Sequence, residues 1–187
     1  TVGKRAVLIG GVRFDKWSNY RGSSTTSTLA TNQTAATVFA DRGDSAVSPR
    51  GSALMRLNDR VSLYGAASGS FRTPTLNELY RGFRVGNVVT RANADLVAET
   101  AIILEGGLLY GRGRTFLRAN VFTANVRNAV ANVTLSITPS LITRQRRNAA
   151  ETRSSGVEIE AERRFSRVTI TAGYLFADST VTSFPSD

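Results

Sequence analysis

Apolar and polar residues alternate along most of this chain with a period of two. The clearest segment runs from Arg167 to Asp178, and its alternate positions are apolar: Val168, Ile170, Ala172, Tyr174 and Phe176. Alternate side chains share one face of a strand, and about ten residues let a tilted strand cross a bilayer. The same pattern predicts six further strands, within 4–15, 61–71, 100–110, 115–127, 130–144 and 155–162. The second of these can begin as early as Ser52, and Pro139 interrupts the fifth.

One predicted strand carries charge on a single face. Val157, Ile159 and Ala161 alternate with three glutamates in the segment 155–162. A strand face with three carboxylates requires water rather than a packed core. Two neighbouring predicted strands also carry polar residues at alternate positions: Glu105 in 100–110, and Arg118 and Asn120 in 115–127.

The connections between the predicted strands differ in length. Residues 16–49 and 72–98 form long polar connections, whereas 111–114 and 165–166 are short turns, and a further turn is expected within 128–133. Alternating long loops and short turns are typical of outer-membrane barrels. No apolar run approaches the roughly 18 residues of a spanning helix, so a membrane crossing would have to use strands. A soluble β-sandwich remains compatible with the alternation alone.

Composition disfavours an enzyme. The chain of 187 residues contains no cysteine and no histidine, which removes Ser-His and Cys-His nucleophiles and the commonest transition-metal ligands. No glycine-rich phosphate loop or zinc-ligand spacing occurs, so we expect no cofactor. The net charge is +10. A basic β-module that binds nucleic acid is one alternative, but the arginines are scattered and we expect no nucleic-acid partner.

A short motif follows the predicted strand 61–71. The run Ser70-Phe71-Arg72-Thr73-Pro74-Thr75-Leu76-Asn77-Glu78-Leu79-Tyr80 resembles the F-R-x-P-T-x-x-E-L-Y signature of TonB-dependent outer-membrane receptors. Three further stretches resemble family elements in the same order: 93–100 with Glu105-Gly106-Gly107 after it, 122–126, and 155–160. Ala94 and Ala98 stand where the family often has proline, which loosens the loop geometry and leaves the resemblance intact.

The signature residues Phe71, Arg72, Pro74, Asn77, Glu78, Leu79 and Tyr80 also have a physical interpretation. Phe71 is a candidate for an aromatic girdle at a strand end, and Pro74 stops β-pairing. Arg72 and Glu78 can pair at the rim, either to order the loop or as a solvated ion pair of little energetic worth. Direct contact with a solute is a weaker expectation than either.

The resemblance implies an antiparallel transmembrane β-barrel segment of about seven strands, belonging to a 22-stranded barrel. It implies that residues 1–187 are part of such a barrel, with the plug domain and the C-terminal barrel strands outside this chain. The implied function is import of a scarce solute, such as a siderophore-iron complex or cobalamin, across the outer membrane of a Gram-negative bacterium. The implied partners are the TonB complex, outer-membrane lipid and a small-molecule or metal-chelate ligand. The lumen-facing candidates in such a barrel are Glu105, Arg118, Asn120, Glu158, Glu160 and Glu162. A self-contained small barrel, acting as an adhesin or anchor, is the main alternative.

Overall fold

The computed structural model describes residues 5–28 and 31–184. Seven long strands dominate it, and together with four short strands and one short helix they make up the described elements. The long strands are β1 (Ala6–Asn19), β4 (Arg42–Arg56), β5 (Val61–Arg72), β8 (Glu99–Arg112), β9 (Thr115–Ile137), β10 (Ile142–Arg164) and β11 (Thr169–Ser183). The all-β antiparallel class predicted from the alternation is confirmed.

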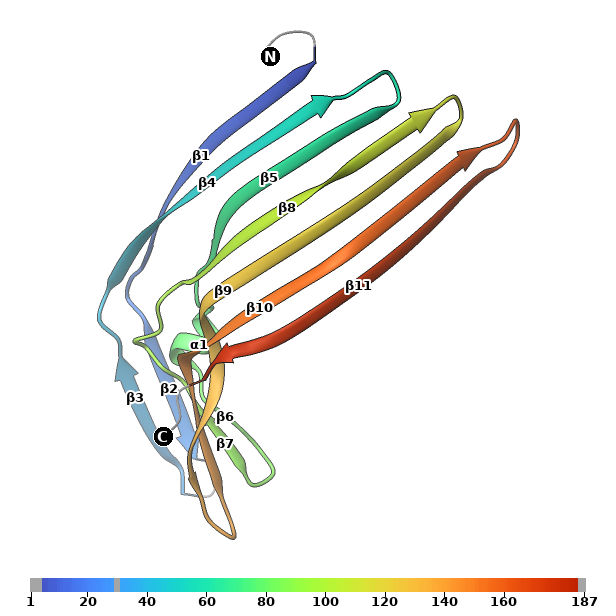
Figure 1. The fold of residues 1–187 in the computed structure, drawn as a ribbon. Helices are drawn as coiled ribbons and strands as arrows, with labels where there is room; N and C mark the ends of the chain where they lie inside the picture. Colours follow the sequence, from blue (N-terminus) through green and yellow to red (C-terminus); the bar gives the residue numbers. More distant parts are fainter. Residues whose placement is uncertain (1–4, 29–30, 185–187) are drawn as a thin grey trace.

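The long strands form one antiparallel sheet in the order β1-β4-β5-β8-β9-β10-β11 (Figure 1). Every neighbouring pair is antiparallel, and the β5–β8 and β8–β9 pairs keep one register from end to end. Among the described residues β1 pairs only with β4 and β11 only with β10, so the sheet has two free edges and is not closed.

The register assigns each long strand one polar and one apolar face. Glu158 lies opposite Asn120, and Asn120 lies opposite Gly107. On the other face Ile159 lies opposite Ala119 and Ala119 opposite Leu108, with Leu63 next in the row. We call the first the polar face and the second the apolar face. Because the exposed large hydrophobic side chains are numerous on the apolar face, that face is suited to lipid rather than water.

The two ends of the sheet differ in their connections, as Figure 1 shows. The β4–β5, β8–β9 and β10–β11 turns lie together at one end, the short-turn end, beside the start of β1. The long-loop end carries the hairpin of β2 (Ser23–Thr28) and β3 (Gln33–Val38). It also carries α1 (Leu76–Tyr80), β6 (Phe83–Val85) and β7 (Val88–Arg91). Within the described part of the chain, no helix has the length and apolarity to span a membrane.

The strands β9 and β10 extend well beyond a bilayer. Each contains 23 residues, or about 75 Å at about 3.3 Å per residue, against a hydrocarbon core of about 30 Å. Their distal halves therefore project at the long-loop end. The small buried core lies there, under the loop between β5 and β8: Leu79, Leu96, Val133, Ala149 and Ala150.

Three predictions about the strands and turns were wrong. The segment 130–144 is not a separate strand: β9 continues to Ile137, Pro139 lies in the turn that follows, and β10 begins at Ile142. The turn expected within 128–133 is a local irregularity, in which Asn128 adopts a φ of 56° and the pairing with β10 shifts at Asn148 and Ala150. Ser52 belongs to β4, a strand separated from β5 by a turn. The expected total of seven strands still equals the number of long strands, because β4 was missed and the strand 130–144 was predicted in error. Lys4, expected to open the first strand, lies outside the described residues.

Two glycines allow close contact between neighbouring strands on the polar face. A Cβ at Gly107 would stand 2.1 Å from the carbonyl oxygen of Ala119 and 3.0 Å from the ring of Tyr64. A Cβ at Gly156 would stand 2.7 Å from the ring of Phe122. In each case an aromatic ring from the adjacent strand covers the glycine, an arrangement that protects the backbone where no side chain fits.

Candidate functional site

The signature segment forms an ion-pair cluster where β5 ends. Arg72 donates hydrogen bonds through Nε and Nη2 to the two carboxylate oxygens of Glu99, at 2.8 and 2.6 Å. It also donates to Glu78, at 3.0 and 3.2 Å. The side chains of Glu78 and Glu99 are only 20% and 16% exposed. One guanidinium therefore joins the end of β5, the helix α1 and the start of β8.

Glu78 also caps the helix. The side chain of Thr75 accepts a hydrogen bond from the Glu78 N–H, while the Glu78 carboxylate accepts one from the Thr75 N–H at 2.7 Å. This reciprocal capping box satisfies two backbone donors at the start of α1. Burial disfavours the charged form of Glu78, but the hydrogen bonds from Arg72 and Thr75 outweigh it and lower the pKa of this carboxyl below its usual value.

Asparagine side chains bind the loop to the distal half of β10. Asn148 accepts a hydrogen bond from the Val97 N–H at 2.9 Å and donates to the Val97 carbonyl at 3.0 Å. It donates a third bond to the carbonyl of Asn128 at 2.6 Å. Asn93 donates to the carbonyl of Arg146 at 2.9 Å, and its own N–H donates to the carbonyl of Glu78. Hydrogen bonds from the side chains of Asn93 and Asn148 to backbone groups thus hold the loop, β9 and β10 together.

Two arginines complete the attachment by binding loop carbonyls. Arg146 donates to the carbonyls of Asn77 and Arg81 at the C-terminal end of α1, where a positive charge is favourable. Arg42 of β4 donates to the carbonyls of Ala94 and Leu96, at 2.5 and 2.7 Å. The register places Arg42, Arg72 and Glu99 on the polar face, so the loop folds over that face.

Apolar contacts fill the space under this network. Leu79 and Leu96 are 2% and 0% exposed. Tyr80 packs against Phe39, with ring centroids 4.4 Å apart. Phe71, which the register places on the apolar face, stacks on Trp17 of β1 at 5.2 Å and an interplanar angle of 11°. Pro74 is buried, and Asn77 contributes its carbonyl rather than its side chain to the Arg146 contact.

A second group of predicted residues lies on the wall formed by β8, β9 and β10. Arg118 is 3.1 Å from Glu158 and 3.7 Å from Glu160, and Asn120 lies beside them, 3% exposed. The structure therefore brings four of the six predicted lumen-facing residues together. Glu162 instead pairs with Arg164 at 2.6 Å, and Glu105 has no ion-pair partner among the described residues.

Polar atoms of this wall have capacity for further contacts. Among the described residues, Nε of Arg118, Oδ1 of Asn120 and the hydroxyl of Tyr64 are buried without a hydrogen-bond partner. Buried polar groups normally have partners. The wall is thus suited to a polar partner, water or polypeptide, lying on the polar face.

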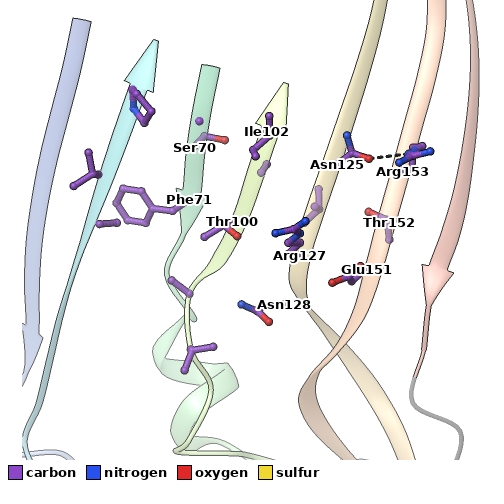
Figure 2. A pocket seen from close by; sticks show the side chains of 18 of the residues that line it. Ser70, Phe71, Thr100, Ile102, Asn125, Arg127, Asn128, Glu151, Thr152 and Arg153 are labelled. Atoms are coloured by element: carbon purple, nitrogen blue, oxygen red, sulfur yellow. Dashed lines mark hydrogen bonds between the residues drawn. The ribbon is translucent and has the colours of Figure 1, made fainter. Parts of the chain in front are cut away.

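A hollow of about 960 Å³ lies on the opposite face. It opens where β4 separates from β5 beyond the Arg50–Ser68 pair. Figure 2 shows Phe71 and Ile102 on one side of it and Asn125, Arg127 and Arg153 on the other. The register puts Phe71, Ile102 and Asn125 on the apolar face, so this hollow is separate from the predicted lumen. None of the six predicted lumen-facing residues lines it.

Sequence reasoning missed several residues that hold the loop: Arg42, Glu99, Arg146 and Asn148. Glu99 lies within the stretch 93–100, which resembles a family element, and this resemblance was the only feature of the sequence that pointed to it. The other three gave none, because the bonds by which they hold the loop join residues about fifty or more positions apart. Within residues 5–28 and 31–184, no three His, Cys, Asp or Glu side chains are grouped so that they could hold a metal ion.

The chain matches a known protein family along its whole length. A family model described as "TonB dependent receptor-like, beta-barrel" matches residues 1–187. No curated protein matches the chain by sequence.

Several solved structures share the fold. The copper transporter OprC superposes with a TM-score of 0.74 at 21% identity, covering 97% of this chain and 28% of that one. The Serratia marcescens hemophore receptor HasR, solved with its hemophore HasA and heme, gives 0.76 at 18% identity, covering 93% and 32%. The ferric yersiniabactin uptake receptor FyuA from Yersinia pestis gives 0.67 at 21% identity, covering 97% and 25%. The chain thus spans about a quarter to a third of the length of these structures.

Proposed function

The chain belongs to the TonB-dependent receptor β-barrel family, and from that premise we propose that it forms part of the barrel wall of an outer-membrane importer. Members of this family are Gram-negative outer-membrane transporters rather than enzymes. In the proposal residues 1–187 are one section of a larger barrel, with a plug domain and further strands encoded elsewhere in the same protein. The two free edges of the sheet support this arrangement, since unpaired strand edges promote aggregation unless another strand covers them.

One observation carries the proposal: the sheet has a polar face and an apolar face over the same seven strands. The apolar face exposes large side chains such as Leu63, Val121 and Tyr174. The polar face carries the Arg118 cluster and is covered at one end by the anchored loop. A soluble sandwich would bury its apolar face, whereas a wide barrel directs it to lipid and encloses water.

Within this function the two groups of site residues have different roles. The wall residues Arg118, Asn120, Glu158 and Glu160 line the lumen and contact the plug through their unsatisfied polar atoms. The signature residues hold the loop against the polar face at the extracellular opening. In this role Arg72 and Glu78 position the loop, while solute recognition belongs to the loop surface and the plug.

The proposed cargo is a scarce solute such as a siderophore-iron complex or cobalamin, imported with energy from the TonB complex. The three structural neighbours are a copper transporter, a receptor solved with its hemophore and heme, and a ferric yersiniabactin uptake receptor, which supports a metal or metal-chelate cargo. No bond is made or broken in such transport. Recognition by loops is followed by movement of the plug.

The test is energised uptake by the full-length protein. It is expressed in a Gram-negative host that lacks its own ferric-chelate and cobalamin receptors, with and without a functional TonB. We expect the cell-associated metal of the transported solute (iron, copper or cobalt), measured by mass spectrometry, to rise only when both the receptor and TonB are present. A receptor that folds in the membrane yet accumulates none of a panel of ferric siderophores, heme, copper chelates and cobalamin would refute the proposed function. Accumulation that is independent of TonB would refute the proposed mechanism.

A further inference from the structure

Eight arginines gather at the short-turn end of the sheet. They occupy the ends and turns of the long strands: Arg5, Arg56, Arg60, Arg112, Arg114, Arg163, Arg164 and Arg167. Figure 1 shows these turns side by side at one end, next to the start of β1. We call these eight residues the arginine row.

Backbone hydrogen bonds hold neighbouring members of the row in sequence along the edge. The N–H of Arg56 donates to the carbonyl of Arg5, and the N–H of Arg164 donates to the carbonyl of Arg114. Arg60 is linked through its carbonyl to Gly111, the residue before Arg112. The row is therefore a continuous feature of the sheet end and not a set of unrelated surface charges.

Little of this charge is neutralised locally. Only Asp59 and Glu162 supply carboxylates at this end, so eight positive and two negative charges leave a net +6, out of +10 for the whole chain. All eight arginines are exposed, and among the described residues only Arg164 has an ion-pair partner, Glu162. Arg163 lies over the ring of Phe165 and donates to Thr115, which leaves it charged.

The row borders the apolar face. Val168 and Ile170 follow the last turn and are 58% and 57% exposed, and Phe165 is exposed in that turn. A cationic edge directly beside an exposed apolar surface matches a bilayer at the level of its headgroups. Arginine stems can lie along the acyl region while the guanidinium groups bind phosphate with paired hydrogen bonds.

We propose that the arginine row binds the anionic phospholipid headgroups of the membrane leaflet at the short-turn end. This inference rests on the proposed membrane-embedded function. A lipid fits better than an acidic protein, because the charges follow the strand ends in a line and the register places Arg112 and Arg163 on the apolar face where that face stops. An acidic protein would instead require a compact basic patch with contacts away from the lipid boundary. Each basic residue close to an anionic surface adds to the attraction, so the effect of the row is cumulative.

The experiment compares full-length receptor variants in phosphatidylcholine nanodiscs that contain a minor fraction of phosphatidylglycerol. The row variant replaces Arg56, Arg60, Arg112 and Arg114 by glutamine, and a charge-retaining version replaces the same four by lysine. A matched control replaces four exposed arginines at the long-loop end by glutamine: Arg84, Arg91, Arg127 and Arg147. Native mass spectrometry counts phosphatidylglycerol molecules retained on each protein, and heat-modifiable gel mobility reports folding.

We expect the row variant to retain at least roughly tenfold less phosphatidylglycerol than wild type, while the control and lysine variants retain most of it. Equal loss in the row and control variants would overturn the inference, because net charge alone would then explain the binding. Retention by a folded row variant would also overturn it, as would a finding that wild type shows no preference for phosphatidylglycerol. If the row variant lost only the binding of an acidic periplasmic protein, the partner would be protein and not lipid. Failure of wild type to insert into the membrane would instead refute the proposed function itself. If the glutamine variant alone misfolded, preferential retention of phosphatidylglycerol by wild type and by the lysine variant would support the inference, and its absence would overturn it.

Discussion

Removal of the Arg72 guanidinium should release the loop between β5 and β8 without unfolding the sheet. The change Arg72→Gln eliminates four charge-assisted hydrogen bonds and leaves two carboxylates, 20% and 16% exposed, close together and unpaired. Hydrogen bonds to charged groups contribute about 1.5 to 3 kcal/mol, and surface ion pairs less than about 1 kcal/mol. Because Arg72 itself is 45% exposed, we expect the loss to lie between these limits, at about 2 to 3 kcal/mol of loop-docking free energy. The open population of the loop should then rise roughly 30- to 150-fold.

Hydrogen exchange measured by mass spectrometry on the full-length receptor in detergent tests this expectation. Amides of α1 should exchange faster by that factor, while amides of β8 near Gly107 should be unchanged. Arg13→Gln is the matched control, since Arg13 also pairs with a carboxylate, Asp15, at 2.6 Å but is 74% exposed. Adding Glu99→Gln to Arg72→Gln should restore part of the protection, because it removes one of the unpaired charges. The reasoning fails if Arg72→Gln accelerates α1 exchange no more than Arg13→Gln does, or if the whole sheet opens equally.

Three further perturbations test other parts of the structure. Gly107→Ala places a methyl group 2.1 Å from the carbonyl oxygen of Ala119, so we expect about 3 kcal/mol of destabilisation and a reduced folded fraction on heat-modifiability gels. The control Gly111→Ala, with no atom within 4 Å of the new methyl group, should fold normally. Equal folded yields of the two variants would contradict the packing argument. Asn148→Ala removes three hydrogen bonds to backbone groups, and about 2 to 3 kcal/mol of local stability should be lost from the loop base, detected as faster exchange there; unchanged exchange would show that water replaces the amide. The pKa of Glu78 is lowered in the folded protein, so its contribution to loop docking is complete above its unfolded value of 4.5 and is lost as the pH falls further. Exchange of α1, corrected for the intrinsic effect of pH, should therefore accelerate only below that value. Glu78→Gln should weaken this pH dependence without abolishing it, because the hydrogen bond from Arg72 also lowers the pKa of Glu99.

The strands that could be predicted from the sequence are those with one apolar face and one polar face along their whole length. β5, β8 and β11 alternate strictly, and their observed limits lie within a few residues of the predicted ones except at the C-terminal end of β11. β4 has a mixed pattern of Ser, Gly, Asp and Arg and was recognised only from Ser52 onward, as an extension of β5. Its place in the sheet is determined by pairing with β1 along its whole length, which is a tertiary effect.

The distal halves of β9 and β10 escaped prediction for a related reason. They project beyond the length of a bilayer and pack against the loop, so the alternation of apolar and polar positions no longer applies there. Asn128 has the composition of a turn residue and adopts a φ of 56°, but it produces an irregularity inside a strand because β10 continues to pair on both sides of it.

The candidate site divides in the same way. The Arg72–Glu78 pair spans six residues and could be proposed from the signature alone. Glu99 lies 27 residues from Arg72, and Asn148 lies 51 residues from Val97. No local pattern relates such positions, because the contacts arise only after the sheet has brought β5, β8 and β10 together.

The strand β7 anchors the loop between β5 and β8 to the sheet. It pairs in parallel with Ile142–Gln145 on the same edge of β10 that β11 occupies farther along, so the base of the loop is part of the sheet. The β6–β7 hairpin ends in a tip at Gly86-Asn87, where Gly86 has a φ of 59° and open space around it. Foreign sequence grafted between these two residues would meet no packed neighbour, while the base keeps its hydrogen bonds. The loop thus separates a part that must be retained from a part that can diversify, which would allow new surfaces to be displayed at the barrel mouth on an unchanged foundation.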